Sequence, residues 1–170
     1  MEYNHYYLIL GSNLGDKMNQ LALARKLIIL RVGDIKSESS LYETQPWGHE
    51  EQPWFMNQVI GVSSPLEPTE LLYTIKNIEK ETGRLPGEKW HERHIDIDIL
   101  LAGTQIIDKD DLVIPHPLLQ LRNFVLVPLM EIACNTLHPV LNQTIEELYM
   151  ECQDRGEVYI FNPDEQDDAV

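Results

Sequence analysis

The chain has 170 residues, a length that suits one compact domain with a sizeable core. Hydrophobic residues make up 43% and charged residues 24%, which excludes a disordered chain and a fibrous repeat. The formal net charge of −15 argues against a nucleic-acid partner, because such proteins bind phosphates through many Lys and Arg side chains. A pocket for one small phosphorylated ligand is compatible with this charge, since such a pocket depends on its local groups.

Cysteine use and the two ends of the chain predict its surroundings. Only Cys134 and Cys152 occur, without CxxC spacing, which fits a reducing compartment better than a disulfide scaffold. No basic leader and no window of about 18 apolar residues is found. We therefore expect a cytoplasmic monomer without a membrane partner. We expect one domain over residues 1–170, with a flexible acidic tail from about residue 162.

Residues 6–10 (YYLIL) are a short apolar run that predicts a first strand, ending at Gly11. Asp16 follows among turn residues and is placed to cap a helix. Apolar residues then recur at steps of three and four as far as Gly33, so this helix has one face that packs on a sheet.

Two strands are expected next. Residues 35–44 alternate weakly and residues 54–64 alternate more clearly. The stretch 45–53 between them is rich in proline, glycine and charge, which predicts a long surface loop. A period of two places Phe55 and Asn57 on one face of the later strand, so an aromatic ring and an amide point the same way.

A second helix is expected to begin at Pro68 and to close at Gly83. On the helical wheel Glu79 lies beside the apolar stripe, which predicts a carboxylate at the rim of the sheet contact, facing a cleft. The polar stretch 84–93 predicts a loop, and the apolar stretch 94–101 predicts a fourth strand.

The order of strand, helix, strand, strand, helix and strand is typical of a ferredoxin-like α+β sandwich with an antiparallel sheet. The rest of the chain is expected to add C-terminal elements to this βαββαβ unit. They are a small hairpin, a short helix begun by proline, another helix and a last strand, over residues 105–114, 123–133, 144–152 and 158–161.

Asp96 and Asp98 interrupt the fourth strand. Residues two apart project from the same strand face, roughly 6 to 7 Å apart, while Ile95, Ile97 and Ile99 take the other face. Two close carboxylates repel each other unless a positive group intervenes. Mg²⁺ is the natural candidate, because one or two carboxylates plus substrate phosphates commonly hold it. The plainer alternative, which a bare DxD favours, is an exposed face with solvated acids.

Basic and aromatic residues around the pair favour a phosphate site. Arg84 and Arg93 flank the polar loop and Trp90 lies in it, which predicts a lid with guanidinium donors and an aromatic surface. His91 and His94 argue only weakly for zinc, because residues three apart on an extended segment face opposite sides.

His116 stands between two prolines that restrict its backbone, and Arg122 follows shortly after it. Taken alone, a histidine in this position is more often packed within a loop than bound to a ligand.

Several segments together resemble the hydroxymethyl-dihydropterin pyrophosphokinase family of folate biosynthesis, over roughly residues 6–133. The segments are ILGSNLGD, SSLYETQPWG, QPWFMNQV, IEKETGR, WHERHIDIDILL, IPHP and RNFVLVPLMEIA. Seven ordered motifs at family-like spacing are a strong signal, whereas any one of them alone is not.

The resemblance implies transfer of a pyrophosphoryl group from ATP to the hydroxymethyl group of 6-hydroxymethyl-7,8-dihydropterin, with release of AMP. It implies two Mg²⁺ ions held by Asp96 and Asp98, with Arg84 and Arg93 as further catalytic residues. The residues implied to bind ATP are Glu79, Trp90, Arg93, Ile99, His116 and Arg122. The residues implied to bind the pterin are Thr44, Gln45, Trp47, Phe55, Asn57 and Phe124, with the two phenylalanines on either side of the ring.

The chain departs from the family in the loop before the aspartates. The family usually shows Trp-Gly-Pro-Arg there, whereas this chain has Trp90-His91-Glu92-Arg93. The loop is also short, and Lys89 is expected to replace a family arginine only in part, because an ammonium lacks the guanidinium fork.

Two other classes of function stay open from the sequence. One is a non-catalytic ferredoxin-like module that senses a nucleotide or a pterin, and the retained aspartates, arginines and His116 count against it. The other is a different Mg²⁺-dependent phosphotransferase or phosphohydrolase, which is distinguished by the acceptor that accelerates ATP consumption.

Overall fold

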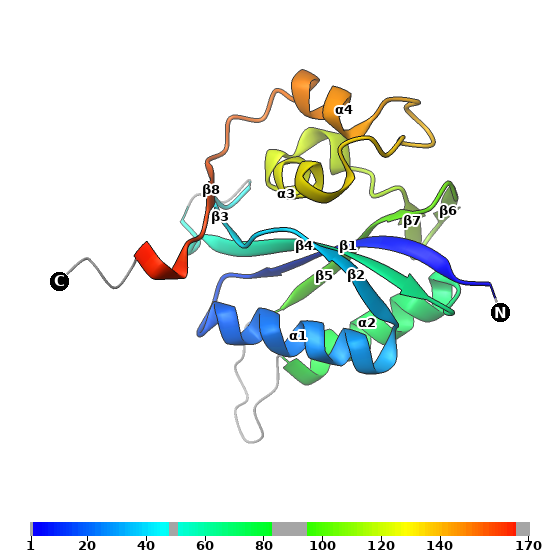
Figure 1. Ribbon diagram of the computed structural model, residues 1–170, viewed down its shortest axis with the longest axis horizontal. Coiled ribbons are helices and arrows are strands. Elements are labelled where there is room, and N and C mark those ends of the chain that lie inside the picture. The colour runs from blue at the N-terminus through cyan, green and yellow to red at the C-terminus, as the bar shows by residue number, and fades with distance from the viewer. Residues whose placement is uncertain (1, 48–50, 83–94, 166–170) are drawn as a thin grey trace.

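The computed structural model describes residues 2–47, 51–82 and 95–165, and the described chain forms three layers (Figure 1). A six-stranded sheet is the middle layer, with strands β1 (Asn4–Ser12), β2 (Asp34–Glu38), β3 (Tyr42–Thr44), β4 (Phe55–Ser64), β5 (Asp96–Ala102) and β8 (Val158–Ile160). One face is covered by helices α1 (Lys17–Arg31) and α2 (Pro68–Thr82), and the other by α3 (Asn123–Ala133) and α4 (Ile145–Glu151).

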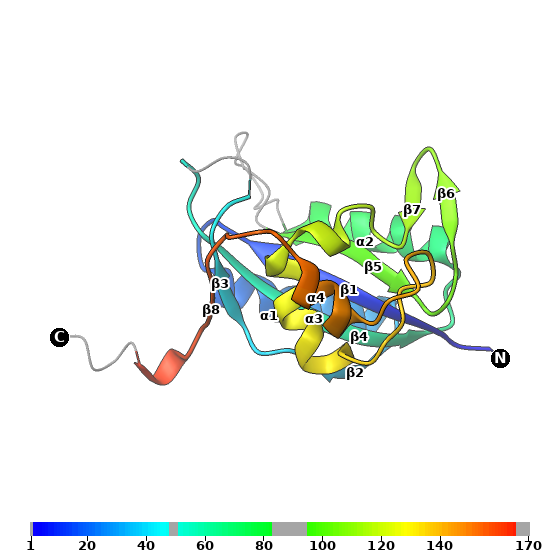
Figure 2. The ribbon, with the colours of Figure 1, turned by 90° about the horizontal axis from the view of Figure 1, so that it is seen from above.

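Three smaller pieces complete the described chain. A separate hairpin, formed by β6 (Ile107–Lys109) and β7 (Leu112–Ile114), stands at one end of the sheet (Figure 2). Two 3-10 turns, η1 (Leu119–Leu121) and η2 (Pro163–Glu165), lie before α3 and after β8. The expected mixed architecture with an antiparallel sheet is confirmed.

The strands run in the order β5-β1-β4-β3-β8, and β2 also pairs with β4. All of these pairings are antiparallel. The last residues of β1 therefore lie beside the first residues of β4 and β5, at one end of the sheet. Helix α1 begins as expected, because the Asp16 side chain accepts a hydrogen bond from the backbone N–H of Asn19 at 3.2 Å.

The prediction of a single strand over residues 35–44 is wrong, because the structure has two strands there, β2 and β3. The break falls at Ser39, whose hydroxyl oxygen accepts a hydrogen bond from the Val59 N–H at 3.0 Å. Ser40 then turns toward α3, where its N–H donates to the Glu131 carboxylate at 3.0 Å. Side-chain groups thus replace part of the backbone ladder between the two strands, although the Ser39 N–H still donates to the Val59 carbonyl at 2.8 Å.

The helix expected over residues 123–133 is confirmed as α3, but its proline, Pro128, lies in the middle of the helix and does not begin it. The N–H of Asn123 donates to the Asp154 carboxylate at 3.0 Å. A contact with a distant part of the chain, which a local pattern does not reveal, therefore marks the start of this helix.

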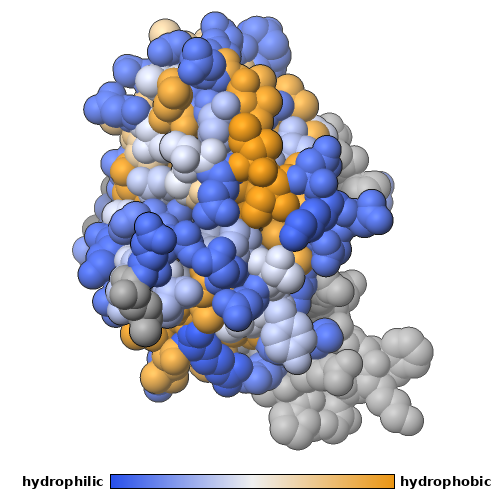
Figure 3. Space-filling view, turned by 90° about the vertical axis from the view of Figure 1, so that its right-hand side faces the viewer, coloured by the Kyte–Doolittle hydropathy of each residue, from blue (hydrophilic) through white to orange (hydrophobic). Residues whose placement is uncertain are grey.

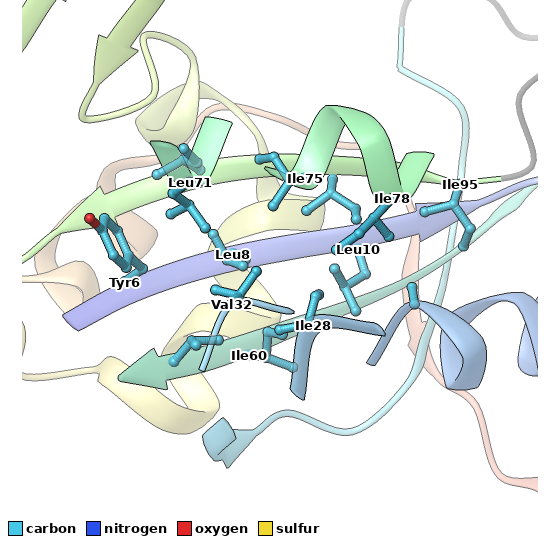
Figure 4. Close-up of a cluster of buried hydrophobic side chains, with 14 of the residues drawn as sticks. Tyr6, Leu8, Leu10, Ile28, Val32, Ile60, Leu71, Ile75, Ile78 and Ile95 are labelled. Atoms are coloured by element: carbon cyan, nitrogen blue, oxygen red, sulfur yellow. The ribbon is translucent and has the colours of Figure 1, made fainter. Parts of the chain in front are cut away.

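Alternating side chains of the strands feed two hydrophobic cores. The first core lies between the sheet and helices α1 and α2, where Leu8 and Leu10 lie beside Ile28, Ile75 and Ile78 (Figure 4). All five side chains are fully buried. Strand positions between these leucines face the other way, and they contribute to the second core beneath α3 and α4.

The expected alternation in β5 is confirmed at its beginning. Ile97 and Ile99 belong to the first core, and the aspartates beside them do not. The register with β1 shifts between Tyr7 and Leu8, which leaves Leu100 as an extra residue in β5. The apolar half of β5 can therefore serve both cores, while its acidic half serves one face only.

Apolar side chains also reach the surface beside the hairpin, between charged ones (Figure 3). Ile106 is 61% exposed and Val113 of β7 is 40% exposed. Within the described ranges, helices long and apolar enough to cross a membrane are absent.

Glu79 joins α2 to β5 through a buried hydrogen bond. Its side chain is only 5% exposed, and its Oε1 accepts from the Ile97 N–H at 2.8 Å. The Lys76 ammonium lies 3.3 Å from the same carboxylate. Burial raises the pKa of the Glu79 carboxyl, against the opposing effects of the Ile97 N–H and Lys76. The carboxylate thus lies inside the helix–sheet contact, not at the exposed rim that the helical wheel predicts.

Replacing Glu79 by Gln removes the buried charge and keeps an oxygen for the Ile97 N–H. Because folding raises the pKa of Glu79 above 4.5, its favourable contribution to stability is complete below pH 4.5 and is lost as the pH rises through the raised pKa. We expect E79Q to be more stable than the wild type at neutral pH, with a gap that closes below pH 4.5. Urea unfolding at several pH values measures this difference.

The matched variant E79A leaves the buried Ile97 N–H without its acceptor, which costs about 1 to 3 kcal/mol. We expect E79A to be less stable than E79Q at every pH. Equal stability of the two variants would show that the hydrogen bond does not hold β5 against α2.

Candidate active site

The antiparallel register gathers polar side chains at one end of the sheet, where β1 ends and β4 and β5 begin. Gly11 at the end of β1 pairs with Asn57 of β4 on one side and with Asp96 of β5 on the other. A cavity opens over this end of the sheet, on the face that α3 covers. Its lining residues are Ile9, Gly11, Thr44, Gln45, Trp47, Phe55, Asn57, Asp96, Asp98, Arg122 and Phe124. The structure therefore brings together all six predicted pterin residues and both predicted metal ligands.

Thr44 and Asn57 form a buried polar pair in the wall of this cavity. The Asn57 Nδ2 donates to the Thr44 hydroxyl at 2.6 Å. Asn57 is 4% exposed and Thr44 is 1% exposed. This bond orients the amide, because both residues lie on strands and their backbones are held by the sheet.

Gly11 makes room for that amide. A Cβ atom at this position would lie 2.5 Å from the Asn57 Oδ1, which is closer than real contacts allow. The residue was expected only as the end of a strand, so its part in the cavity was missed. The available signal was a glycine at the end of an apolar run, which often marks a close approach of another group.

Arg122 lies against two aromatic rings of the cavity. Its guanidinium carbon is 4.5 Å from the centroid of Trp47 and 5.5 Å from the centroid of Phe124. These distances are those of cation–π contacts. Arg122 thus contacts the same aromatic side chains that the sequence analysis assigned to the pterin ring.

The Arg122 Nε is buried and has no hydrogen-bond partner among the described residues. A buried donor without an acceptor costs about 1 to 3 kcal/mol. Burial lowers the pKa of the guanidinium, and the Asp98 and Asp154 carboxylates oppose that effect. An anionic oxygen at this position would satisfy the donor and balance the charge.

Asp96 and Asp98 lie on the cavity side of β5, as their spacing predicts. Asp96 is exposed and Asp98 is half-buried. Asp98 also lines a second cavity between α2, β5 and β7, together with Ile99 and His116. Asp98 is therefore common to the linings of the two cavities.

His116 is held by its own loop with one ring nitrogen facing the protein. Its Nδ1 accepts from the Leu118 N–H at 3.1 Å, and its backbone N–H donates to the Leu100 carbonyl at 3.0 Å. Burial lowers the pKa of the imidazole, with Arg122 adding to that effect and Asp98 opposing it. The favoured form is a neutral ring with its proton on Nε2, which makes Nε2 a donor.

The remaining predicted site residues differ in their placement. Arg84, Trp90 and Arg93 lie outside the described residues, and so does the departing sequence around His91. Glu79 does not line either cavity, since it lies behind β5 in the contact with α2.

The described carboxylates suit a cation that is shared with a ligand. Among residues 2–47, 51–82 and 95–165, groups of three or more His, Cys, Asp or Glu side chains that could hold a metal ion do not occur. Asp96 and Asp98 can supply two carboxylates, so the remaining oxygen ligands would have to come from water or substrate. This donor set fits Mg²⁺, and it does not fit a structural zinc site.

Comparison with known sequences identifies close relatives. The sequence profile of 7,8-dihydro-6-hydroxymethylpterin-pyrophosphokinase (HPPK) matches residues 7–134. A 2-amino-4-hydroxy-6-hydroxymethyldihydropteridine pyrophosphokinase of Aquifex aeolicus is 41% identical over 141 residues, covering 83% of this chain and 88% of that protein. The protein of the same name from Haemophilus influenzae is 40% identical over 149 residues, covering 87% and 92%.

Longer proteins contain the same unit. The folic acid synthesis protein FOL1 of Dictyostelium discoideum is 40% identical over 160 residues, which cover 94% of this chain and 24% of that protein. The crystal structure of a Plasmodium falciparum HPPK-DHPS triple mutant matches with a TM-score of 0.75 at 20% identity, over 88% of this chain and 43% of the other. That structural likeness shows the fold. The profile match and the shorter relatives lead to one conclusion: the chain belongs to the 7,8-dihydro-6-hydroxymethylpterin-pyrophosphokinase family.

Proposed function

We propose that this chain is a pyrophosphokinase of folate biosynthesis that uses ATP and 6-hydroxymethyl-7,8-dihydropterin. The hydroxymethyl oxygen attacks the β-phosphorus of ATP, the bond from that phosphorus to the oxygen shared with the α-phosphorus breaks, and AMP leaves. The hydroxyl proton passes to solvent. The observation that carries the proposal is the position of Asp98, which lines both cavities and so stands where two substrates would meet.

The first cavity supplies the groups that a pterin needs. A flat heteroaromatic ring is recognised by stacking surfaces and a few fixed polar groups. Phe55 and Phe124 offer the surfaces, while Asn57 and Thr44 offer polar atoms at one wall. Because the amide is held over Gly11, its orientation is set before the ligand arrives.

The second cavity supplies the groups that ATP needs. Ile99 and Ile75 give it an apolar wall, and Lys76 and His116 bring donors to its edge. A neutral His116 can donate a hydrogen bond from its Nε2–H to a phosphate oxygen, and the ring stays uncharged. The buried Arg122 Nε is suited to a second phosphate oxygen.

Asp96 and Asp98 are the residues that would hold Mg²⁺. When bound, the ions offset phosphate charge and align the attacking and leaving oxygens. Through such ions the two carboxylates would orient the phosphates, and Arg122 and His116 would donate hydrogen bonds to phosphate oxygens. Arg84, Trp90 and Arg93, which lie outside the described residues, are proposed to act on ATP, as the family resemblance implies.

We also propose that the core is a ferredoxin-like sandwich within one domain. The strand order β5-β1-β4, with β2 and β3 both on the far side of β4, supports this arrangement. The two cores on opposite faces of one sheet support a single domain.

The reaction itself provides the test. With ATP, Mg²⁺ and 6-hydroxymethyl-7,8-dihydropterin, we expect the folded protein to form AMP and pterin pyrophosphate in equal amounts, as measured by chromatography. ADP as the product, or AMP without pterin pyrophosphate, would indicate a different phosphotransferase or phosphohydrolase. Binding of both ligands without turnover would indicate a sensing module.

Replacing Asp98 by Asn keeps the shape of the side chain and removes its charge. Because the carboxylate is proposed to hold Mg²⁺ between the cavities, we expect kcat to fall by roughly a hundredfold or more. The exposed Asp108 of β6 provides the matched control D108N, which should keep full activity. Wild-type turnover in folded D98N would remove the metal role of this residue.

Replacing Gly11 by Ala introduces a Cβ into the position beside the Asn57 amide. We expect the KM for the pterin to rise about tenfold, with the KM for ATP unchanged, because Asn57 must move away from Thr44. G61A is the control, since its Cβ would crowd Ser37 and Tyr7 of the same sheet, away from the cavity. It should lower stability without affecting the KM for the pterin. A similar pterin KM in both variants would contradict the role of Gly11.

A further inference from the structure

Residues 154–160, which we call the C-terminal strap, cross the end of the sheet that carries the pterin cavity. The strap leaves α4, passes the beginning of α3 and ends as β8 beside β3 (Figures 1 and 2). It lies outside residues 7–134, which the family profile matches. Its contacts reach three separate walls of the cavity.

The first contact is with the beginning of α3. The Asp154 Oδ2 accepts from the Asn123 N–H at 3.0 Å, and its Oδ1 accepts from the Gly156 N–H at 2.9 Å. The Asn123 amide in turn donates to the Gly156 carbonyl. Asn123 stands between Arg122 and Phe124, which both line the cavity. One carboxylate thus holds the backbone that carries these two side chains.

The second contact is with β3. Val158 pairs with Thr44 in an antiparallel register, so β8 covers the edge that β3 would otherwise expose. The Gln45 N–H donates to the Glu157 carbonyl at 3.0 Å, and the Glu157 N–H donates to the Gln45 Oε1 at 3.2 Å. The strap therefore holds the backbone of Thr44 and Gln45 through strand pairing and hydrogen bonds.

The third contact is with the beginning of β4. The Tyr159 ring is stacked on Trp54, with centroids 6.1 Å apart and planes inclined by 5°. Trp54 directly precedes Phe55, another residue of the cavity. The strap thus links the walls that carry Phe55, Thr44 and Phe124, although these residues belong to different elements.

We propose that Asp154 is a positioning residue for pterin recognition, which acts through Asn123 to set the places of Arg122 and Phe124. This inference rests on the proposed function. A helix N–H that loses its acceptor frees the first turn to move, and loose support of a site weakens binding even when every contacting residue remains. The Asp154 carboxylate accepts the two hydrogen bonds on its two different oxygens, whereas a carboxamide has only one acceptor oxygen.

The experiment compares Asp154→Ala and Asp154→Asn with Asp164→Ala, which removes an exposed carboxylate of η2, just beyond the strap. We expect D154A to raise the KM for the pterin about tenfold and the KM for ATP by only about two- to threefold, because Arg122 is the one ATP residue that Asp154 supports. D154N should lie between D154A and the wild type, because one acceptor oxygen remains. D164A should match the wild type.

A pterin KM in D154A equal to that of the wild type would overturn the inference, and so would an equal rise in both KM values. If D154A does not fold, D154N decides by the same comparison. Hydrogen exchange at the Asn123 N–H needs no turnover, and it should be faster in D154N than in D164A. Unchanged exchange would overturn the inference, whereas an inactive wild type with faster exchange in D154N would contradict the proposed function alone.

Discussion

The antiparallel register of β1 between β4 and β5 is the constraint on which the rest of the site depends. It sets Gly11 beside Asn57 on one strand and beside Asp96 on the other. A slip of one residue would turn every side chain to the opposite face, because strands alternate with a period of two. The buried leucines of β1 resist such a slip, since it would move them out of the first core and turn them toward the second. Hydrophobic packing therefore holds the polar site in place.

The charges of the site are balanced locally, in contrast to the net charge of −15. Asp98 opposes the burial effects on the pKa of both His116 and Arg122. The acid, the imidazole and the guanidinium are therefore coupled across the junction of the two cavities. A phosphate and a cation would enter a place that already contains both signs of charge, which suits a ligand that carries both. The acidic excess elsewhere has little effect on this junction, because solvent screens distant charges.

Contacts between distant segments explain where the local patterns were insufficient. The break between β2 and β3 depends on Ser39 and β4, and the start of α3 depends on Asp154, which follows 31 positions later. Glu79 lies on the side of α2 that a helical wheel can indicate, but its hydrogen bond to Ile97 requires the helix and β5 to be packed together. Such pairings involve residues that are far apart in the sequence, so periodicity carries no signal for them.

By itself the sequence determined the strand and helix types, the shared face of Phe55 and Asn57, and the outward pair of aspartates, because these depend on periods of two and 3.6 residues. Its ordered motifs also indicated the family. Only the tertiary structure decided that Gly11 makes room for the amide, that Asp98 lines two cavities, and that a C-terminal strap pairs with β3 beside the first cavity. The physical reason is that cavities and supports are made by surfaces of separate elements, which exist only after those elements have packed.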